Sequence, residues 1–560
     1  MTDLSASDLC VVIASRGRPD TLARTLDSLT HQTVSGHDIV VVVDGTDEPV
    51  PSVPPDVRTI VQPHAGPGVA RNAGAATTDR PLLLFLGADM IPTTALVERH
   101  VAAHANEPDS HAAVLGRVAW HPEVAHNSIN RWLDWSRSQF DYGALDRQHA
   151  HGERDAGFGR FYSCNVSLKR ELFVQSGGFD PDFVLFYEDL DLGWRLGELG
   201  MVLRYEPRAL VHHHHAYDWP ALESRFRGIA VGERMMAQKH AWFEPWFRDR
   251  IAPALDGPPI WSGWARWVDR VPAATPFVRA RAGRWYWQRL ADPFLEAWEG
   301  ERDRDELRRY LGDDYDEDRL QRHVAGLQEE EAAAPDERTF YRTSRAYLYD
   351  LTVFSMSGTK APYRRLVREV AHPGARMLDY GCGIGVDGLR LLEQGYRVEF
   401  ADFDNPSVEY LRWRLQQRGL EARIHDIERD IPGGFDVAYC FDVLEHVDDP
   451  VALLERLESL ADIVVVNFLE PAPHGHDPHE DHLHRALPIT DLLDRAAEHG
   501  LLHYSVHHGR SHLVAYRSQP TASPIRRARS RAWRVAGSHP REVTALRRVE
   551  HLVERLRTRA

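Results

Sequence analysis

With 560 residues, 43% hydrophobic content and a formal net charge of -16, the chain is longer than one hydrophobic core usually supports, so we expect two or three domains. The four cysteines, Cys10, Cys164, Cys382 and Cys440, have no CxxC spacing, which excludes a disulfide framework and a zinc ribbon and favours a reducing cytoplasm. No run of about 18 apolar residues occurs, so the sequence predicts neither a signal peptide nor a membrane-spanning helix.

The first part of the chain alternates between short apolar runs and helical stretches. This alternation predicts the parallel sheet of an α/β domain. In open sheets of this kind, ligands collect at the carboxyl ends of the strands, where polar loops begin. We expect strands at 10–14, 39–43, 58–61 and 81–86, and helices at 20–30 and 68–77.

Polar residues follow several of these strands in a recognisable order. Ala14-Ser15-Arg16-Gly17-Arg18-Pro19 closes the first strand, Asp44 ends the second, and Gly66-Pro67-Gly68-Val69-Ala70-Arg71-Asn72-Ala73-Gly74 opens a helix. In these motifs, residues 9 to about 235 resemble a family 2 glycosyltransferase of the GT-A fold. The resemblance implies that Ser15 and Arg16 line a nucleotide pocket, that Asp44 binds the base or ribose, and that Arg71 lies near the base and diphosphate of a nucleotide-sugar, with a UDP-sugar favoured.

The donor of such a reaction leaves as a nucleoside diphosphate, whose growing negative charge a divalent cation neutralises. The family supplies ligands with a DxD-type motif, and here Leu86-Gly87-Ala88-Asp89-Met90 keeps only the last aspartate. The resemblance therefore implies Asp89 as a ligand of Mn²⁺ or Mg²⁺. It implies a histidine from Val211-His212-His213-His214-His215 as a second ligand, and because side chains alternate along an extended segment, we favour His213, with His215 next.

An acceptor hydroxyl loses its proton as it attacks the anomeric carbon, and a carboxylate accepts this proton. Glu188-Asp189 matches the acidic pair of the family, which implies Asp189 as the base of a single inverting displacement. Asp191 is the alternative. The competing interpretation is a solvated helix start, where the helix dipole favours carboxylates.

Beyond about Trp219 the sequence changes to helices rich in tryptophan and arginine. This composition suits either helices at a bilayer interface or a packed interdomain seam, and we favour the seam. The acidic, alanine-rich stretch at 329–335 predicts a linker. Within sixty residues the tryptophans are Trp242, Trp246, Trp261, Trp264, Trp267, Trp285, Trp287 and Trp298.

A second α/β unit begins near residue 337, and its first strand runs into Gly381-Cys382-Gly383-Ile384-Gly385. Glycines at a strand-to-helix turn let the backbone approach a ligand, although this spacing alone also suits a dinucleotide. Together with the later segment Phe435 to Val447, the turn resembles class I methyltransferases that use S-adenosylmethionine. The resemblance implies that the cofactor is bound by Asp379, Gly381, Gly383, Gly385, Asp402, Asp426 and Asp442.

Methyl transfer from a sulfonium needs alignment above all, and an alcohol acceptor benefits from a base. His446 and His482, the latter in Asp481-His482-Leu483-His484, are the candidate bases. The histidines and carboxylates between 474 and 484 are alternatively a metal site or a plain surface enrichment. Their spacing matches no standard zinc pattern.

Residues 521–560 hold eleven arginines and three glutamates, so the rest of the chain is still more acidic. An acidic body disfavours nucleic-acid binding, whereas the basic tail suits an anionic membrane surface, an acidic partner or simple solvation. A regular apolar spacing from Val543 to Leu556 predicts one amphipathic helix there.

The sequence thus predicts an α/β protein with an N-terminal GT-A domain (1–235), a helical connector (236–336), a Rossmann-like methyltransferase domain (337–518) and a basic helical tail (519–560). We expect a cytoplasmic bifunctional transferase, peripheral at the inner face of the membrane if the tail binds lipid. It would glycosylate a glycan, lipid-linked or other hydroxyl acceptor and O-methylate a sugar or related product. The alternatives are a methyltransferase for an unrelated acceptor, or one half that only binds.

Overall fold

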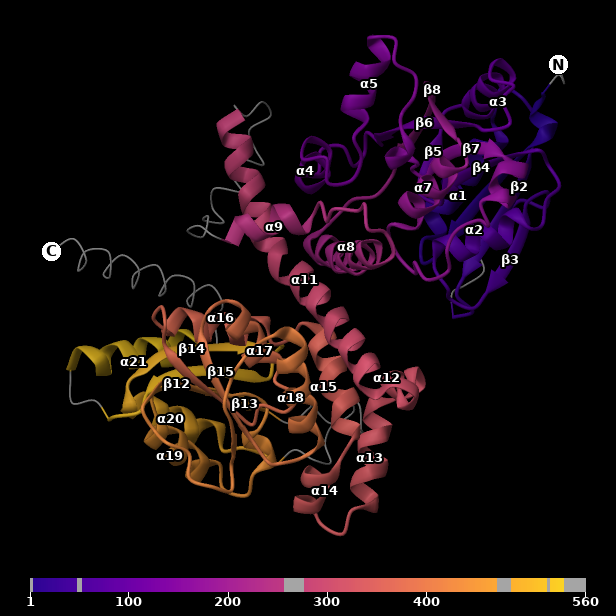
Figure 1. The fold of residues 1–560 in the computed structure, drawn as a ribbon. Helices are drawn as coiled ribbons and strands as arrows, with labels where there is room; N and C mark the ends of the chain where they lie inside the picture. The colour runs from indigo at the N-terminus through magenta and orange to yellow at the C-terminus, as the bar shows by residue number, and fades with distance from the viewer. Residues whose placement is uncertain (1–3, 48–52, 256–275, 471–484, 521–523, 538–560) are drawn as a thin grey trace. The chain divides into compact units, whose positions relative to one another are not determined.

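The computed structural model describes residues 4–47, 53–255, 276–470, 485–520 and 524–537 (Figure 1). The chain divides into two compact units, Met1–Trp298 and Glu299–Ala560. The predicted amphipathic helix at 543–556, three of the tryptophans (Trp261, Trp264 and Trp267) and His482 lie outside the described residues. None of the described helices is long and apolar enough to cross a bilayer.

The first unit is built on an eight-stranded mixed sheet in the order β3-β2-β1-β4-β7-β6-β8-β5. Strands β3, β2, β1 and β4 are parallel, as the alternating sequence predicts, and β7 reverses the direction beside β4. The strands are β1 (Leu9–Ser15), β2 (Asp38–Asp44), β3 (Arg58–Gln62), β4 (Leu82–Gly87), β5 (Met90–Pro92), β6 (Ala112–Trp120), β7 (Asn165–Lys169) and β8 (Val202–His213). All four predicted strands are confirmed.

Helices cover this sheet and continue beyond it. The predicted helices at 20–30 and 68–77 are confirmed as α1 and α2, because apolar side chains recur on one face of each. The helices are α1 (Pro19–Thr30), α2 (Pro67–Ala75), α3 (Leu96–Asn106), α4 (Ser128–Trp135), α5 (Tyr142–Ala150), α6 (Arg170–Gln175), α7 (Glu188–Glu198), α8 (Trp219–Lys239), α9 (Arg248–Leu255) and α11 (Pro276–Leu311).

The tryptophan-rich helices form a second hydrophobic core inside the first unit. Trp132 of α4 stacks on Tyr286 of α11 with ring centroids 4.5 Å apart, and Trp298 and Phe226 belong to the same cluster. Packing within one unit therefore accounts for the tryptophan enrichment of the described helices.

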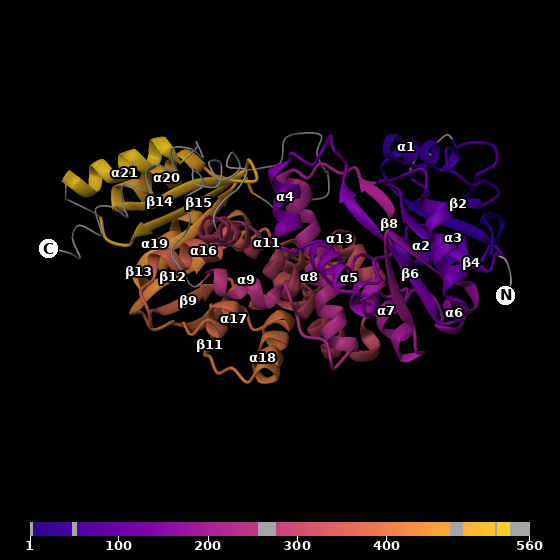
Figure 2. The same cartoon turned by 90° about the horizontal axis from the view of Figure 1, so that it is seen from above.

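The second unit holds a seven-stranded sheet in the order β11-β10-β9-β12-β13-β15-β14, in which β15 alone runs antiparallel to the other strands. Figure 1 shows α16 and α17 on one face and α19 and α20 on the other, and Figure 2 gives the same elements from above. The strands are β9 (Arg376–Tyr380), β10 (Arg397–Asp402), β11 (Ile424–Asp426), β12 (Phe435–Cys440), β13 (Ala461–Leu469), β14 (Leu501–His507) and β15 (Ser511–Arg517).

The linker predicted at 329–335 is wrong over most of its length, because α13 continues to Ala333. Alanine and glutamate are strong helix formers, and Glu330 is fixed in place by hydrogen bonds from the Arg345 and Ala346 backbone N–H groups. The helices of this unit are α12 (Glu317–Gln321), α13 (His323–Ala333), α14 (Glu337–Thr343), α15 (Ala346–Ser357), α16 (Ala361–Val370), α17 (Val386–Glu393), α18 (Pro406–Arg418), α19 (Pro450–Leu460), α20 (Ile489–His499) and α21 (Pro524–Ala536).

Candidate active sites

The carboxylate of Asp44 organises the loop that follows β3. It accepts hydrogen bonds from Gln62 Nε2 (2.9 Å), His64 Nδ1 (2.8 Å) and the backbone N–H groups of Ala65 (2.9 Å) and Gly66 (3.0 Å). Burial acts to raise the pKa of Asp44, but these hydrogen bonds hold it below its ordinary value. Asp44 is therefore an ionised residue that shapes the edge of the sheet.

Ser15 and Arg16 lie at the end of β1, next to the end of β2. Ser15 is buried and lies beside Val43 in the parallel register. The Arg16 Nη1 donates a hydrogen bond to the Asp44 carbonyl oxygen at 3.1 Å, and its guanidinium lies 3.6 Å from the Asp47 carboxylate. The structure thus brings three of the four predicted nucleotide-contacting residues, Ser15, Arg16 and Asp44, to adjacent strand ends.

Asp89 lies in the turn between β4 and β5, where it faces β8. Its Oδ2 lies 3.2 Å from His213 Nε2 and also contacts the guanidinium of Arg18. Burial acts to raise the pKa of Asp89, but the adjacent His213, Arg18 and His215 outweigh it and hold that pKa well below its ordinary value. An ionised carboxylate beside imidazole nitrogens is a suitable start for a divalent-cation site.

Gly87 stands where the related motif has its first aspartate, and the packing around it disfavours a longer side chain. A Cβ at this position would lie 2.9 Å from Met90 Cγ and 3.6 Å from Cys164 Cβ. A longer side chain would therefore require Met90 to shift. The chain has lost both the first carboxylate and the space for it.

His213 and His215 lie on the same side of the chain, with ring centroids 5.9 Å apart. His213 is buried and stacks on Trp120 at 4.8 Å, because Trp120 and His213 are register partners in the parallel pair β6 and β8. The Nε2 of His215 is buried and has no hydrogen-bond partner among the described residues. Burial lowers the pKa of His215 to about 4, so its imidazole is neutral and has a free lone pair at neutral pH.

In the acidic pair at the start of α7, Glu188 is buried and Asp189 is half-buried. Arg71 Nη1 donates to Glu188 Oε1 at 3.1 Å, and both side chains are about nine-tenths buried, whereas the adjacent Asp189 accepts from the Leu190 N–H at 2.9 Å. Burial, with the charge of Glu188, raises the pKa of Asp189 to about 7. Such a carboxylate is poised to take up a proton near neutral pH.

Asp191 has other partners. Its Oδ2 accepts from both Nε (2.9 Å) and Nη2 (2.7 Å) of Arg195, and its Oδ1 lies 2.8 Å from His240 Nε2. This carboxylate is 2% exposed and holds α7 against the residue that follows α8. Its geometry is that of a fixed structural ion pair.

The turn into α7 is strained, and glycines of α8 make room for it. Phe186 and Tyr187 have φ values of 62° and 68°, in the left-handed region that disfavours residues with a Cβ. A Cβ at Gly228 would lie 2.7 Å from Phe186 Cε2, and one at Gly232 would lie 2.8 Å from the Phe186 carbonyl oxygen. Close approach of α8 therefore fixes the position of the acidic pair.

The groups of this first site lie near Cys164, whose carbonyl oxygen accepts a hydrogen bond from the Gly87 N–H at 3.1 Å. After burial, the charges that act most on the Cys164 thiol are those of Asp189, Arg71 and Asp89, and together these effects raise its pKa. The cation-ligating candidate Asp89 and the candidate base Asp189 thus lie near one half-buried side chain. Sequence reasoning assigned no role to Cys164, Trp120 or Arg18 here, because only the sheet register brings them together.

The glycine turn of the second unit has the backbone that its sequence requires. Gly381, Gly383 and Gly385 have φ values of 72°, 52° and 74°. A Cβ at Gly383 would lie 2.6 Å from Leu351 Cδ1, and one at Gly381 would lie 2.4 Å from Val443 Cγ2. Only glycine meets both demands.

Three carboxylates hold or border this turn. Asp379 accepts from the Gly388 N–H at 3.0 Å and Asp402 accepts from the Gly383 N–H at 2.7 Å. Burial raises the pKa of Asp402 to about 6. Asp402 and Asp426 line the same cavity of about 340 Å³, together with Phe403. The cavity is thus lined by two of the four predicted cofactor-binding carboxylates, which are register partners in β10 and β11.

The strand end after β12 carries a second cluster of charged groups. Asp442 has a φ of 55° and its Oδ2 lies 3.0 Å from Lys360 Nζ, while its Oδ1 accepts from Asn467 Nδ2 at 2.7 Å. Glu445 is fully buried, and neither carboxylate oxygen has a hydrogen-bond partner among the described residues. Burial, with the charge of Asp442, raises the pKa of Glu445 to about 8.

His446 lies beside Tyr341, whose hydroxyl is 3.1 Å from His446 Nδ1. The other predicted base, His482, lies in the segment 471–484 outside the described residues. Sequence reasoning missed Lys360, Glu445 and Asn467 as neighbours of Asp442. Glu445 lies in the segment Phe435 to Val447 that carries the methyltransferase resemblance, so the sequence could have identified it. Lys360 and Asn467 come from other elements, and no sequence pattern links them to Asp442.

The two sites belong to two kinds of transferase domain. Residues 10–165 match the model of glycosyl transferase family 2, and residues 357–511 match that of a methyltransferase domain. The chain therefore combines a family 2 glycosyltransferase domain of the GT-A type with a Rossmann-like methyltransferase domain, as the motifs predict. This confirms the predicted fold class.

Individual relatives match each half separately. A pre-mycofactocin glycosyltransferase of Mycobacterium tuberculosis is 32% identical over 242 residues, which cover 40% of this chain and 47% of the relative. A ubiquinone biosynthesis O-methyltransferase of Xanthomonas campestris pv. campestris is 33% identical over 96 residues, which cover 16% of this chain and 40% of the relative. A mannosyltransferase of Pyrobaculum calidifontis, solved with GDP-Man and Mn²⁺, aligns with a TM-score of 0.31 at 15% identity, over 65% of this chain and 88% of that one. The chain thus spans about half the length or less of the curated relatives it matches.

Proposed function

We propose that this chain is a bifunctional transferase that moves a sugar from a nucleotide-sugar to a hydroxyl acceptor and methylates a sugar or related product. The observation that carries the first half is that Asp89, beside His213, and Asp189, beside the Arg71–Glu188 ion pair, both lie near the half-buried Cys164. This arrangement supplies two carboxylates in one region of the first unit: Asp89 to bind a cation and Asp189 to accept a proton. The two domain families support the same assignment.

In the sugar-transferring site, Asp89 and His213 are suited to hold a divalent cation, because the Asp89 Oδ2 lies 3.2 Å from His213 Nε2, and the orphaned Nε2 of His215 joins them once its ring turns toward the carboxylate. When bound, Mn²⁺ or Mg²⁺ neutralises charge on a diphosphate. Asp189 takes the acceptor proton on its carboxylate, and Arg71 holds Glu188 so that the charge beside Asp189 is balanced. We propose a single inverting displacement, with Asp191 in a structural role. A UDP-sugar is the favoured donor and a glycan or lipid-linked alcohol the favoured acceptor.

In the methyl-transferring site, the turn Gly381–Gly385 and the cavity beside Asp402 and Asp426 fit S-adenosylmethionine, because the cavity is lined by carboxylates suited to ribose and adenine groups. When bound, this cofactor supplies an activated methyl group. Asp379 and Asp402 fix the turn by accepting backbone N–H groups, and Asp442 is held by Lys360 and Asn467. His446 and Glu445 are the groups that hold or accept an acceptor proton, with His482 a further candidate.

A purely binding role of the first half is the second candidate, and the loss of a carboxylate at Gly87 and the contact of Arg18 with Asp89 favour it. The two candidates are separated by measuring release of UDP or GDP from nucleotide-sugars with Mn²⁺ in the wild type and in Asp89→Asn. We expect the variant to lose cation-dependent turnover by roughly 100-fold or more, since it removes an electrostatic stabiliser of the leaving group. Binding of S-adenosylhomocysteine is the control and should not change. Equal turnover in both proteins would refute the catalytic proposal.

A further inference from the structure

A second group of metal-ligating side chains lies on the opposite face of β8 from His213. His121 and His214 directly follow the register partners Trp120 and His213, and the His121 N–H donates to the His213 carbonyl oxygen at 2.9 Å. Side chains of successive residues in paired strands point to opposite faces of the sheet. His121 and His214 therefore point to one face, and Trp120 and His213 point to the other. Their ring centroids are 4.9 Å apart.

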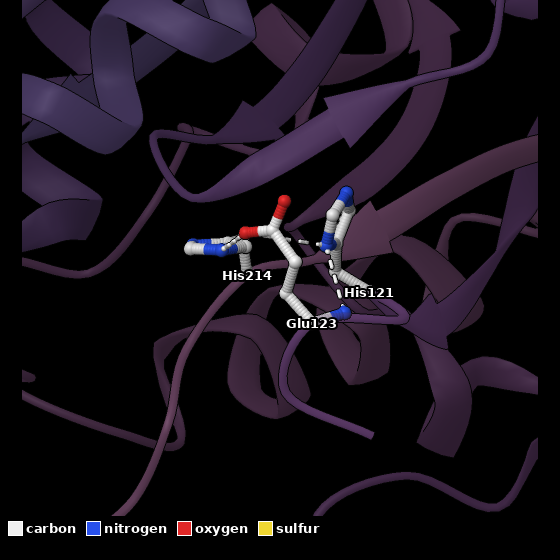
Figure 3. Close-up of side chains that lie close together, drawn as sticks. All are labelled: His121, Glu123 and His214. Atoms are coloured by element: carbon white, nitrogen blue, oxygen red, sulfur yellow. Dashed lines mark hydrogen bonds and ion pairs between the residues drawn. The ribbon is translucent and has the colours of Figure 1, made fainter. Parts of the chain in front are cut away.

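Glu123 completes this group. Figure 3 shows its carboxylate between the two imidazole rings. Its Oε2 lies 2.8 Å from His214 Nε2 and 4.0 Å from His121 Nδ1, and one ligand atom of each residue lies within 4.8 Å of the others. The donor atoms around a tetrahedral Zn²⁺ are roughly 3.3 Å apart, since each lies about 2.0 to 2.1 Å from the ion. Small side-chain rotations therefore bring the three atoms to the spacing of a cation site.

Arg24 of α1 occupies the neighbourhood of this group. Its Nη1 lies 3.0 Å from Glu123 Oε2 and 3.0 Å from His214 Nε2, and its Nη2 donates to Glu123 Oε1 at 3.2 Å. His121 Nδ1 accepts a long hydrogen bond of 3.3 Å from the Glu123 N–H, and a cation bound at this nitrogen replaces that weak bond. The Arg24 guanidinium thus lies beside the donor atoms, where a cation would bind. It is held there by its ion pair with Glu123, and both side chains of that pair are exposed.

We propose that His121, Glu123 and His214 form a second divalent-cation site, suited to Zn²⁺, in which the cation displaces the guanidinium of Arg24. Two imidazoles and one carboxylate are a donor set that Zn²⁺ prefers over Mg²⁺ or Ca²⁺, which favour oxygen ligands. The proposal is independent of the sugar-transfer assignment, because none of these three residues belongs to the group around Cys164.

The site has a structural consequence for the first one. The His214 N–H donates to the Asp89 carbonyl oxygen at 2.9 Å, so a cation that fixes His214 also fixes the turn that bears Asp89. The same cation would tie together the chain segments that follow β6 and β8. Its role is to hold the sheet edge, and it does not contact the reacting groups.

The test is the zinc content of the full chain after removal of metals with a chelator and equilibration against buffered Zn²⁺. The double variant His121→Gln/Glu123→Gln should hold about one equivalent less than the wild type, since three ligands define one site. His126→Gln, which removes an exposed histidine five positions away, is the matched control and should hold the wild-type amount. This difference measurement cancels zinc held by the many other histidines of the chain.

Two further variants make the result decisive. Arg24→Gln should keep the equivalent and bind it up to about fivefold more tightly, because an exposed ion pair no longer competes. Asp89→Asn should keep the equivalent even if it abolishes sugar transfer. Melting curves recorded in chelator establish that each variant folds, and the visible spectrum of bound Co²⁺ reports the same site directly. Equal zinc content and equal Co²⁺ spectra in the wild type and the double variant would overturn the proposal.

Discussion

At the residue scale, the most consequential feature of the first site is the raised pKa of Asp189. Its half-buried carboxyl group lies beside Glu188, and both the partial desolvation and the charge of Glu188 disfavour its charged form. Arg71 reduces the cost, but it is already bonded to Glu188. A base with a pKa near 7 is strong enough to take a proton from an acceptor and still ionises under neutral conditions.

This pKa predicts the pH dependence of sugar transfer. We expect kcat/KM to rise as the pH increases through about 7, the value to which the pKa of Asp189 is raised, because only the ionised carboxylate accepts the proton. This rise is measured from initial rates between pH 5.5 and 8.5 at a fixed cation concentration. A flat profile over this range would exclude Asp189 as the base.

The stability of Asp189→Asn is the control for this interpretation. Since the pKa in the folded chain lies above the ordinary 3.8, the folded state binds more protons than the unfolded state between these two values. The stabilising contribution of the protonated group is therefore complete below pH 4 and is lost as the pH rises through about 7. The amide carries no charge, so we expect Asp189→Asn to melt at a higher temperature than the wild type at pH 8 and at a similar one near pH 4.

At the scale of elements, the second half of α11 supports the glycine turn of the methyltransferase domain through buried ion pairs with α18. Asp303 Oδ1 lies 2.8 Å from Arg418 Nη2, and Glu306 Oε2 lies 2.8 Å from Arg414 Nε. Arg414 in turn donates to the Ile384 carbonyl oxygen at 2.8 Å. A helix outside the parallel sheet thus positions the backbone between Gly383 and Gly385.

We predict that Asp303→Asn destabilises the second unit by about 3 to 5 kcal/mol, because three buried arginines, Arg390, Arg414 and Arg418, then share one buried carboxylate, Glu306, instead of two. The variant should also bind S-adenosylhomocysteine more weakly. Urea unfolding followed by circular dichroism measures the first effect, and titration calorimetry measures the second. Asp313→Asn, at an exposed position just beyond the same helix, is the matched control. Equal midpoints for both variants would contradict this support.

At the scale of the whole molecule, two compact units each contain one candidate site. Ligands that bind only folded protein stabilise it by an amount that depends on their concentration relative to Kd, about 2.7 kcal/mol at 100 times Kd. Sites that share no residues contribute independently. The two halves should therefore respond separately to their own ligands.

We expect thermal melting of the full chain to shift upward with S-adenosylhomocysteine and, separately, with UDP or GDP plus Mn²⁺. Asp402→Asn should lose only the first response and Asp89→Asn only the second, because each removes a carboxylate from one site. Loss of both responses in either variant would show that the units do not act separately.

The sequence by itself determined the elements and the residues at their ends. The apolar runs that became β1, β2 and β4 are local patterns, and the glycines at 381, 383 and 385 are required by a turn whose φ values only glycine adopts freely. Asp89 and Asp402 follow buried strands, so their place at a sheet edge follows from the alternation of strand and helix. The linker at 329–335 was misjudged because an acidic alanine-rich stretch is equally a good helix.

Only the tertiary structure decided what these side chains contact. The alignment of His121 with His214 depends on the register of β6 and β8, and the engagement of Asp191 by His240 depends on how α8 packs on α7. Likewise, Lys360 reaches Asp442 from an element 82 positions earlier. Partners so distant in the chain are selected by sheet register and helix packing, which depend on the whole core, whereas strands and turns are fixed by the preferences of a few neighbouring residues.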